Sequence, residues 1–145
     1  MNQFLNLNCK SKNLIYLIEC KCTKQYIGGT KRQLHERCGE HRRSIRNNHQ
    51  LIKPTPVSTH FNQPGHSIDH LLLTPLELIH NTRDSVRKAR EAHLIYKTMT
   101  LEPLGINRRD EQNELFFLTY HSFLFYISKL LYVTVILYFF AFIFF

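Results

Sequence analysis

The stretch "LIYLIECKCTKQYIGGT", Leu14–Thr30, decides the fold that we expect. It holds two short runs rich in Ile, Leu and Tyr, at Asn13–Glu19 and Gln25–Gly28, a composition typical of β-strands. The polar link Cys20–Lys24 is short enough to join the two runs as an antiparallel hairpin. The glycine pair Gly28-Gly29 is expected to end the second strand and to let the backbone turn tightly.

The chain beyond this hairpin predicts one helix, one strand and a second helix. Thr30 is expected to cap a helix over Lys31–Arg46, because its hydroxyl can accept from a free backbone amide of the first turn. Leu71–Ile79 is apolar enough for a third strand, which Pro75 would confine to a sheet edge or break. Thr82–Thr98 predicts the second helix. The order β-β-α-β-α indicates a small α/β (α+β) domain, with a mostly antiparallel sheet flanked by helices.

The composition changes abruptly after Glu114, beyond which Phe, Tyr, Leu and Ile dominate and Lys129 is the single charged residue. We therefore divide the chain into an N-terminal lead at 1–7, a domain at 8–110 and a hydrophobic C-terminal tail at 111–145. Residues 123–145 are long enough to span a hydrocarbon core of about 30 Å as a helix. Two interpretations stay open, a transmembrane anchor or a non-native read-through of AT-rich noncoding sequence.

The charge of the chain is strongly positive, with 19 Lys and Arg against 11 Asp and Glu, a net charge of +8. A basic body suits a polyanion, either nucleic acid or anionic lipid, and the alternative is a charge that serves solubility alone. The glycine spacing does not match a phosphate-cradling loop of the G-x-x-x-x-G-K-[ST] type. Nucleotide-hydrolysing enzymes built on that loop are therefore not supported.

The cysteines favour reduced thiols or a metal site over disulfides, because Met1–Ser11 has no apolar secretory signal segment. A structural zinc site is one interpretation, with ligands drawn from Cys9, Cys20, Cys22 and His60 or His66. Against it, the C-x-C spacing is uncommon in zinc sites and no second close pair of cysteines is present. The favoured interpretation is two unrelated buried thiols with loop histidines.

The first predicted helix carries the residues with the strongest chemical interest. Arg37 and His41 are four residues apart and therefore share a helix face. Because this helix follows the hairpin, Arg37 can converge with Tyr26 near its beginning. Each residue alone has a simpler interpretation: a strand tyrosine packs the sheet, and a helix arginine faces solvent. Glu91 on the second helix can simply pair with Arg87.

The motifs together resemble one known family. "LIY", "YIGGT", "LHERCGEH", "REAHLIYK" and "GINRR" occur in the order found in GIY-YIG endonuclease domains, of the type found in Penelope-like retroelement reverse transcriptases. The resemblance covers Asn8 to Arg109. The sequence departs from the family at Leu14, which replaces the first glycine of the name, and at Cys20-Lys21-Cys22, where similar elements carry C-x-x-C.

The resemblance implies a metal-dependent DNA nicking activity derived from a mobile element. The family positions imply catalytic roles for Tyr16, Tyr26, Arg37, His41 and Glu91. Glu91 would hold Mg²⁺ or Mn²⁺, Arg37 would contact the phosphate, and Tyr16 would help to activate water together with His41. Contacts to DNA are expected from Lys31, Arg32, Arg42, Arg43 and Asn107.

Two other functions stay open. The first is a catalytically inactive module that still binds nucleic acid, and the second is a small basic protein anchored in a membrane by its tail. The expected location follows from the tail: nuclear if it is absent or buried, and membrane if residues 123–145 form an anchor.

Overall fold

The computed structural model describes residues 7–50 and 52–109. Its strands form one antiparallel sheet in the order β2-β1-β3, with bounds β1 Leu14–Cys20, β2 Gln25–Thr30 and β3 Leu71–Leu78. Its helices are α1 Leu34–Arg46, α2 Pro56–Phe61 and α3 Asp84–Lys97. Short 3₁₀ turns lie at Asn48–Gln50 and Ile68–His70. The predicted α+β class is confirmed, and α2 is an element that the sequence analysis missed.

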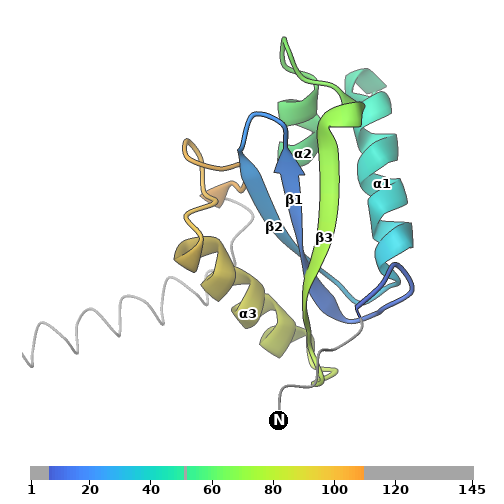
Figure 1. The fold of residues 1–145 in the computed structure, drawn as a ribbon, viewed down its shortest axis with the longest axis vertical. Coiled ribbons are helices and arrows are strands. Elements are labelled where there is room, and N and C mark those ends of the chain that lie inside the picture. The colour runs from blue at the N-terminus through green and yellow to red at the C-terminus, as the bar shows by residue number, and fades with distance from the viewer. Residues whose placement is uncertain (1–6, 51, 110–145) are drawn as a thin grey trace, which may run out of the picture. The chain divides into compact units, whose positions relative to one another are not determined.

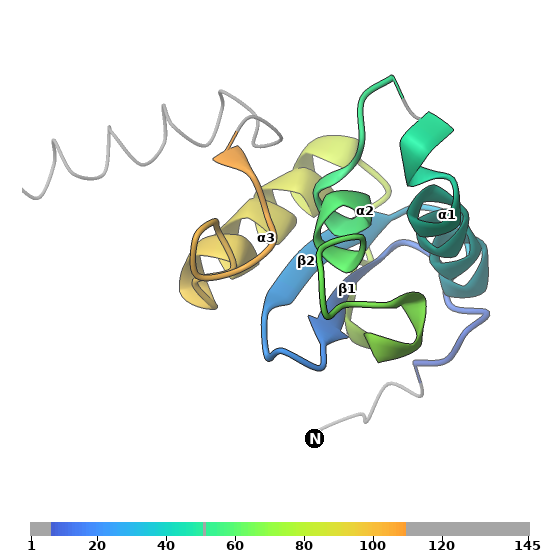
Figure 2. The same ribbon diagram turned by 90° about the horizontal axis from the view of Figure 1, so that it is seen from above.

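Alternation along β1 divides the core between the two faces of the sheet, because successive side chains of a strand point to opposite sides. Tyr16 and Ile18 pack with Leu34 of α1 and with the α2 residues on one face. Ile15 packs with Ile95 of α3 on the other. Figures 1 and 2 show the resulting three layers, with the sheet between α1 and α3. The hairpin strands are therefore buried on both sides.

β3 is an edge strand, as Pro75 predicted. Pro75 lies opposite Tyr16, and Glu77 lies opposite Ile15, so that Leu76 is an extra residue in the pairing. Proline has no backbone N–H to donate, which an edge strand tolerates because one side of its backbone has no partner strand. The bulge at this point bends the edge and reduces its capacity to pair with another strand.

The two glycines of β2 have a different role from the one predicted. β2 runs through both of them to Thr30, where the sequence analysis expected a tight turn. A Cβ atom on Gly28 would lie 2.5 Å from the Tyr16 hydroxyl oxygen, and one on Gly29 would lie 2.7 Å from Glu91 Oε2. These positions need glycine because side chains from both faces approach the backbone of β2 closely.

The predicted start of the first helix is wrong by three residues. Thr30 is the last residue of β2, and α1 begins at Leu34 with Gln33 as its N-cap. The Thr30 hydroxyl instead accepts from the Arg32 backbone N–H at 3.1 Å. The Gln33 N–H donates to Glu36 Oε2 at 3.2 Å, one arm of a capping box. The chain uses residues 31–33 to leave the sheet before the helix can form.

The predicted tail at 111–145 lies outside the described residues. Within 7–50 and 52–109, no helix combines the length and the apolar character needed to cross a membrane. The transmembrane interpretation of the tail therefore stays a prediction.

Candidate active site and metal centre

Three of the predicted catalytic residues form one hydrogen-bonded chain. The Tyr16 hydroxyl lies 2.8 Å from His41 Nε2, and Arg37 Nε donates to the same hydroxyl oxygen at 2.9 Å. Tyr16 comes from the middle of β1, and the other two come from one face of α1. Tyr16 is completely buried and His41 is only 3% exposed. Hydrogen bonds in such a setting fix the side chains in one arrangement.

The protonation states in this chain follow from burial. Burial raises the pKa of Tyr16 to about 12, although Arg37 acts in the opposite direction. Burial, assisted by the Arg37 charge, lowers the pKa of His41 to about 3. At neutral pH the phenol is therefore protonated and the imidazole is neutral. Because Arg37 Nε donates to the hydroxyl oxygen, the Tyr16 proton is free for donation to His41 Nε2 in the tautomer that carries its ring proton on Nδ1.

Arg37 is held from its other end by Glu40, a residue that the sequence analysis did not single out. Arg37 Nη1 lies 2.9 Å from Glu40 Oε2, and Arg32 Nη1 lies 2.5 Å from Glu40 Oε1. Burial alone would raise the pKa of Glu40, but the two guanidinium groups hold it below its usual range. The carboxylate thus sits between two cations, in the arrangement that a phosphate group also favours.

Tyr26 lies beside this chain. Its ring centroid is 6.0 Å from that of His41, with the rings edge to face, and the side chain is 8% exposed. One edge of its ring also approaches Gly28, at the same place as the Tyr16 hydroxyl. The two tyrosines of the hairpin therefore converge on one glycine and one histidine.

Glu91 approaches the same strand from the opposite face. α3 covers the face of Ile15, whereas Tyr16 and α1 lie on the other. The Glu91 carboxylate lies over Gly29, and its charge contributes to the raised pKa of Tyr16. Burial raises the pKa of Glu91, while Arg87 and the Gly29 backbone amide act in the opposite direction. Glu91 and Tyr16 therefore approach the Gly28-Gly29 backbone of β2 from opposite faces of the sheet.

The residues around Glu91 fit a weakly held divalent cation. Among the described residues, three or more metal-ligating side chains gather only in a separate cysteine–histidine group, so a cation at Glu91 would have fewer than three such protein ligands. Mg²⁺ accepts such a site because it keeps several waters and shares phosphate oxygens. Arg87 Nη1 lies 3.7 Å from Glu91 Oε2, which is the simpler pairing expected from the sequence. A cation must compete with this guanidinium.

The basic residues expected to contact DNA fall into two pairs. Lys31 is tied to Asp84 at 2.6 Å and Arg32 to Glu40, so both are engaged within the protein. Arg42 and Arg43 are exposed on α1. A depression of about 450 Å³ lies on this side of α1. Its lining residues are Arg32, His35, Glu36, Gly39, Glu40 and Arg43.

Asn107 is buried and is hydrogen-bonded to the backbone of β2. It is 2% exposed, its Oδ1 accepts from the Ile27 N–H at 2.9 Å, and its Nδ2 donates to the Ile27 carbonyl at 2.8 Å. The Ile106 N–H donates to the Gln25 carbonyl at 2.9 Å. These bonds attach the segment after α3 to the outer edge of β2. A direct DNA contact from Asn107 stays a prediction, and this burial does not favour it.

A second group of functional side chains lies at the tip of the hairpin. Cys20, Cys22, His60 and His66 bring one ligand atom each to within 4.8 Å of one another. Cys22 Sγ lies 3.5 Å from His60 Nε2, and the His60 and His66 ring centroids are 4.5 Å apart. The cysteines come from the end of β1 and the turn after it, and His60 comes from α2. We call these four residues the Cys/His cluster.

The interpretation of these thiols and histidines as unrelated is wrong. Cys9 lies apart from the Cys/His cluster, near the start of α1, where its carbonyl accepts from the His35 N–H at 2.9 Å. Both histidines join the group, where the sequence analysis expected only one. The sequence offered a joint Cys/His site as its less favoured interpretation, because the C-x-C spacing is uncommon in zinc sites and α2, which carries His60, was not foreseen.

The donor set of the Cys/His cluster matches zinc chemistry. Two thiolates and two imidazoles form a common set for tetrahedral Zn²⁺, with Zn–S near ~2.3 Å and Zn–N near ~2.0 Å. Those bond lengths require ligand atoms roughly 3.3–3.8 Å apart, and the Cys22–His60 separation of 3.5 Å meets that requirement. Burial lowers the pKa of His60 to about 4, with a further contribution from His66. His60 is therefore neutral at pH 7, the form that binds metals.

Comparison of the chain with protein-family models, with curated proteins and with solved structures finds no match. The resemblance to GIY-YIG endonucleases therefore rests on the sequence motifs alone.

Proposed function

We propose that residues 8–110 form a metal-dependent DNA endonuclease domain that nicks a phosphodiester bond, derived from a mobile element and similar to the GIY-YIG domains of Penelope-like reverse transcriptases. The observation that carries the proposal is the buried Arg37–Tyr16–His41 chain beside the glycine edge of β2, with Glu91 over the same edge. Tyrosine, histidine and arginine on one face of this glycine edge, with a carboxylate on the other face, are the kinds of group that phosphodiester hydrolysis needs.

Substrate binding would use Arg37 and Arg32, the two cations that contact Glu40. A phosphate group offers the same pair of oxygens that Glu40 now presents to Arg37 and Arg32. Arg37 is half-exposed and already fixed by its bond to Tyr16, so that it can contact an entering phosphate without reorganisation. Arg42 and Arg43 extend the basic surface along α1 toward neighbouring phosphates.

Proton transfer then involves Tyr16 and His41. A phenol with a pKa of about 12 is not ionised at neutral pH, so Tyr16 is not present as a phenolate base before the reaction begins. We propose a relay in which water attacks the phosphorus and gives a proton to Tyr16, Tyr16 passes its own proton to His41 Nε2, and the P–O bond to the leaving oxygen breaks. Because the pKa of His41 is about 3, its imidazolium is a strong acid and returns this proton through solvent to the leaving oxygen. Arg37 Nε stabilises the phenolic oxygen during this exchange.

A divalent cation at Glu91 would supply electrostatic stabilisation of the phosphate charge that develops in the transition state. Glu91 is suited to hold it because burial disfavours its carboxylate charge, and Arg87 at 3.7 Å offsets this only in part. The Gly29 position keeps this carboxylate next to the backbone of β2.

The test is nicking of supercoiled plasmid by the full chain, with Mg²⁺ or with chelator. Glu91→Ala is expected to abolish nicking and leave DNA binding within about threefold, because Glu91 serves the cation and not the phosphate contacts. Asp69→Ala, at an exposed carboxylate in the turn before β3, is the matched control and should nick normally. Normal nicking by Glu91→Ala would remove this residue from the proposed role.

The same assay separates the alternative function of an inactive nucleic-acid-binding remnant. That alternative is favoured by the pairing of Glu91 with Arg87, which leaves the carboxylate engaged without a cation. It predicts salt-sensitive DNA binding that weakens in Arg42→Ala and Arg43→Ala, with no nicking at any Mg²⁺ concentration. A nuclear location follows from either DNA function. A membrane location requires the tail, and fractionation of the chain with and without residues 111–145 tests it.

We further propose that the Cys/His cluster holds a structural zinc ion. The four side chains come from the hairpin and from α2 with the turn after it, so an ion here would join two segments that are distant in sequence. Purified protein should contain close to one zinc per chain, measured by elemental analysis. Cys22→Ser should lose the zinc, and Cys9→Ser should retain it.

A further inference from the structure

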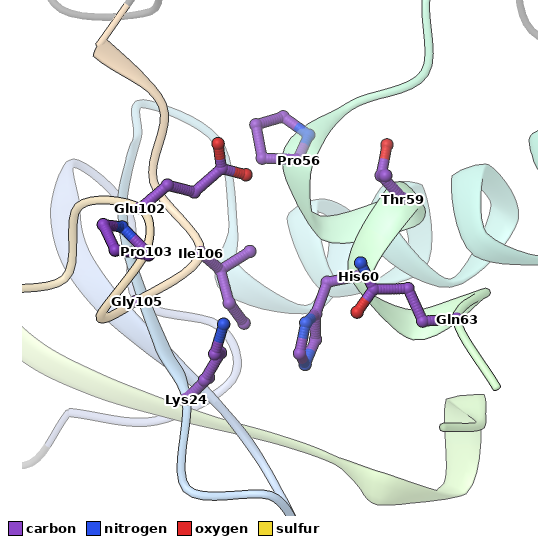
Figure 3. Close-up of a pocket in the computed structure, with 9 residues that line it drawn as sticks. All are labelled: Lys24, Pro56, Thr59, His60, Gln63, Glu102, Pro103, Gly105 and Ile106. Carbon is purple, nitrogen blue, oxygen red and sulfur yellow. The ribbon is translucent and has the colours of Figure 1, made fainter. Parts of the chain in front are cut away.

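A pocket of about 280 Å³ lies beside the Cys/His cluster and is separate from the candidate active site. Figure 3 shows that its walls come from three segments: the hairpin turn, α2 with the turn after it, and the loop that follows α3. The polar lining residues are Lys24, Thr59, His60, Gln63 and Glu102, and the apolar ones are Pro56, Pro103 and Ile106. The pocket thus combines flat apolar walls with a few converging polar groups.

The charges in the pocket argue against an anion. Lys24 and Glu102 place one positive and one negative side chain on its lining. Glu102 is held by Arg108, with Oε1 3.5 Å from Arg108 Nε, and Arg108 also donates to the Thr59 hydroxyl at 3.2 Å. A phosphate here would meet the Glu102 carboxylate. A neutral group with both donors and acceptors meets partners of both kinds.

The volume of the pocket fits one small planar ring system. About 280 Å³ lies just below the range of about 300–1,000 Å³ typical of small-molecule sites, so it suits a single planar fragment. Prolines and an isoleucine provide the apolar walls between which extruded nucleobases stack in other proteins. Lysine is a donor to guanine O6 and N7, and glutamate accepts from the cytosine amino group.

The pocket is built on the same strand as the candidate active site. Lys24 immediately precedes β2, and Gly28 lies four residues further along it. At about 3.3 Å per residue the two sites are roughly 13 Å apart along the strand, about four nucleotides at duplex spacing. The bonds from Ile106 to Gln25 and from Asn107 to Ile27 fix the loop wall of the pocket to this strand. The two sites are therefore held in a constant register.

We propose that this pocket binds one unpaired nucleobase of the DNA substrate, within about four nucleotides of the cleaved bond, and so gives the nuclease a base preference. This inference rests on the proposed function, because the occupant is taken from the DNA that the active site would cleave. Lys24 and Glu102 read the edge of the base, Gln63 supplies a further amide, and the proline walls cover its faces.

The first test is a profile of cut positions on randomised DNA with Mg²⁺. Wild-type protein should prefer one base at one position within about four nucleotides of the cut. Lys24→Ala and Glu102→Gln should each reduce that preference by about tenfold, the usual cost of one lost base contact. Lys21→Ala is the matched control: it changes an exposed lysine of the same hairpin turn that does not line the pocket. Its profile should equal that of wild type.

Three results would overturn the base pocket. These are a wild-type protein without a base preference near the cut, two pocket variants that keep the wild-type profile, and a Lys21→Ala profile changed as much as theirs. The cut positions from the same sequencing experiment distinguish all three results. All three variants change exposed side chains, so loss of folding does not obscure the comparison.

A second test separates failure of the pocket from failure of the nuclease. If wild-type protein does not nick DNA, binding is measured without Mg²⁺ on a series of oligonucleotides, each lacking one base. A base pocket predicts one position where the missing base weakens binding about tenfold, and loss of this effect in Glu102→Gln. Equal binding across the series would exclude the pocket, whether or not the protein is a nuclease.

Discussion

The two ends of the β1–β2 hairpin both carry reactive side chains. Those at the glycine end pair with one another, whereas those at the tip form a set of metal-ligating atoms. At the glycine end, Tyr16, Arg37 and His41 satisfy one another through hydrogen bonds of 2.8 and 2.9 Å. At the tip, the Cys/His cluster brings four ligand atoms within 4.8 Å of one another, and Cys22 contacts His60 at 3.5 Å as well as His66 and Cys20. The first arrangement is stable without a ligand. The second is an assembly of donors, and a bound cation would complete it.

This difference indicates how one hairpin can serve two purposes. Polar groups in a buried site must be paired, and the glycine end meets that requirement with protein groups alone. Thiols and imidazoles pair poorly with each other but bind soft or borderline cations well. We therefore expect the tip to depend on metal for stability, and the glycine end to depend on side-chain geometry for activity.

The largest expected effect is removal of metal from the tip. Cys22→Ser, or a strong chelator, should lower the free energy of unfolding by about 4 kcal/mol or more, because zinc binding in small sites contributes directly to folding. For a domain of this size that is a fall of more than ~15 °C in the thermal midpoint. Differential scanning calorimetry measures it. Cys9→Ser, outside the cluster, should change little, and an equal fall for both variants would contradict a metal at the tip.

The next effect concerns activity at the glycine end. Arg37→Ala should reduce nicking by about 10²–10³-fold, because it removes a preorganised cation from the phosphate and a donor from Tyr16. Arg37→Lys should recover only part of this, since one ammonium cannot contact Tyr16 and Glu40 as the guanidinium does. Single-turnover nicking rates provide the measurement. Arg46→Ala, an exposed arginine in the last turn of α1, is the control. Activity of Arg37→Ala near that of the control would separate Arg37 from the chemistry.

A smaller effect should follow from adding one methyl group to β2. In Gly28→Ala the new Cβ lies 2.5 Å from the Tyr16 hydroxyl oxygen, so the ring must move, at a cost of about 1–3 kcal/mol. Gly39→Ala is the matched control in α1, where the nearest atom is 3.5 Å away, in ordinary contact. That variant should gain about 0.5–1 kcal/mol from helix propensity. Urea denaturation of the two variants should therefore give shifts of opposite sign, and shifts of the same sign would contradict the close approach at Gly28.

The last effect is the pH dependence contributed by His41. Its pKa in the folded protein, about 3, lies below the usual value of 6.5, so the unfolded chain binds the proton more readily. The stability from this residue is complete above pH 6.5 and is lost as the pH falls toward 3. Wild-type protein should therefore lose more stability than His41→Gln between pH 6.5 and pH 4, measured by urea denaturation. His49→Gln, an exposed residue, should follow wild type. Parallel curves for wild type and His41→Gln would show that His41 titrates normally.

Local features were predictable because they depend on a few adjacent residues. The alternation of "LIYLIEC" placed Tyr16 with Leu14 and Ile18 on one face of a strand, and Pro75 placed β3 at an edge. The four-residue spacing of Arg37 and His41 placed them on one helix face. The start of α1 was missed because a threonine at the end of a strand and a threonine cap look alike in sequence.

The sequence by itself therefore determined the strands, the helix faces and the pairing of the hairpin, since strand and helix periods are properties of the backbone. Tertiary structure alone decided which distant residues meet. The Cys/His cluster joins residues about 40 positions apart, and Glu91 reaches Gly29 only because α3 packs on the opposite face of the sheet. Glycine at both positions of β2 was visible as a motif. That it serves close approach and not a turn depends on the side chains that pack against it from both faces.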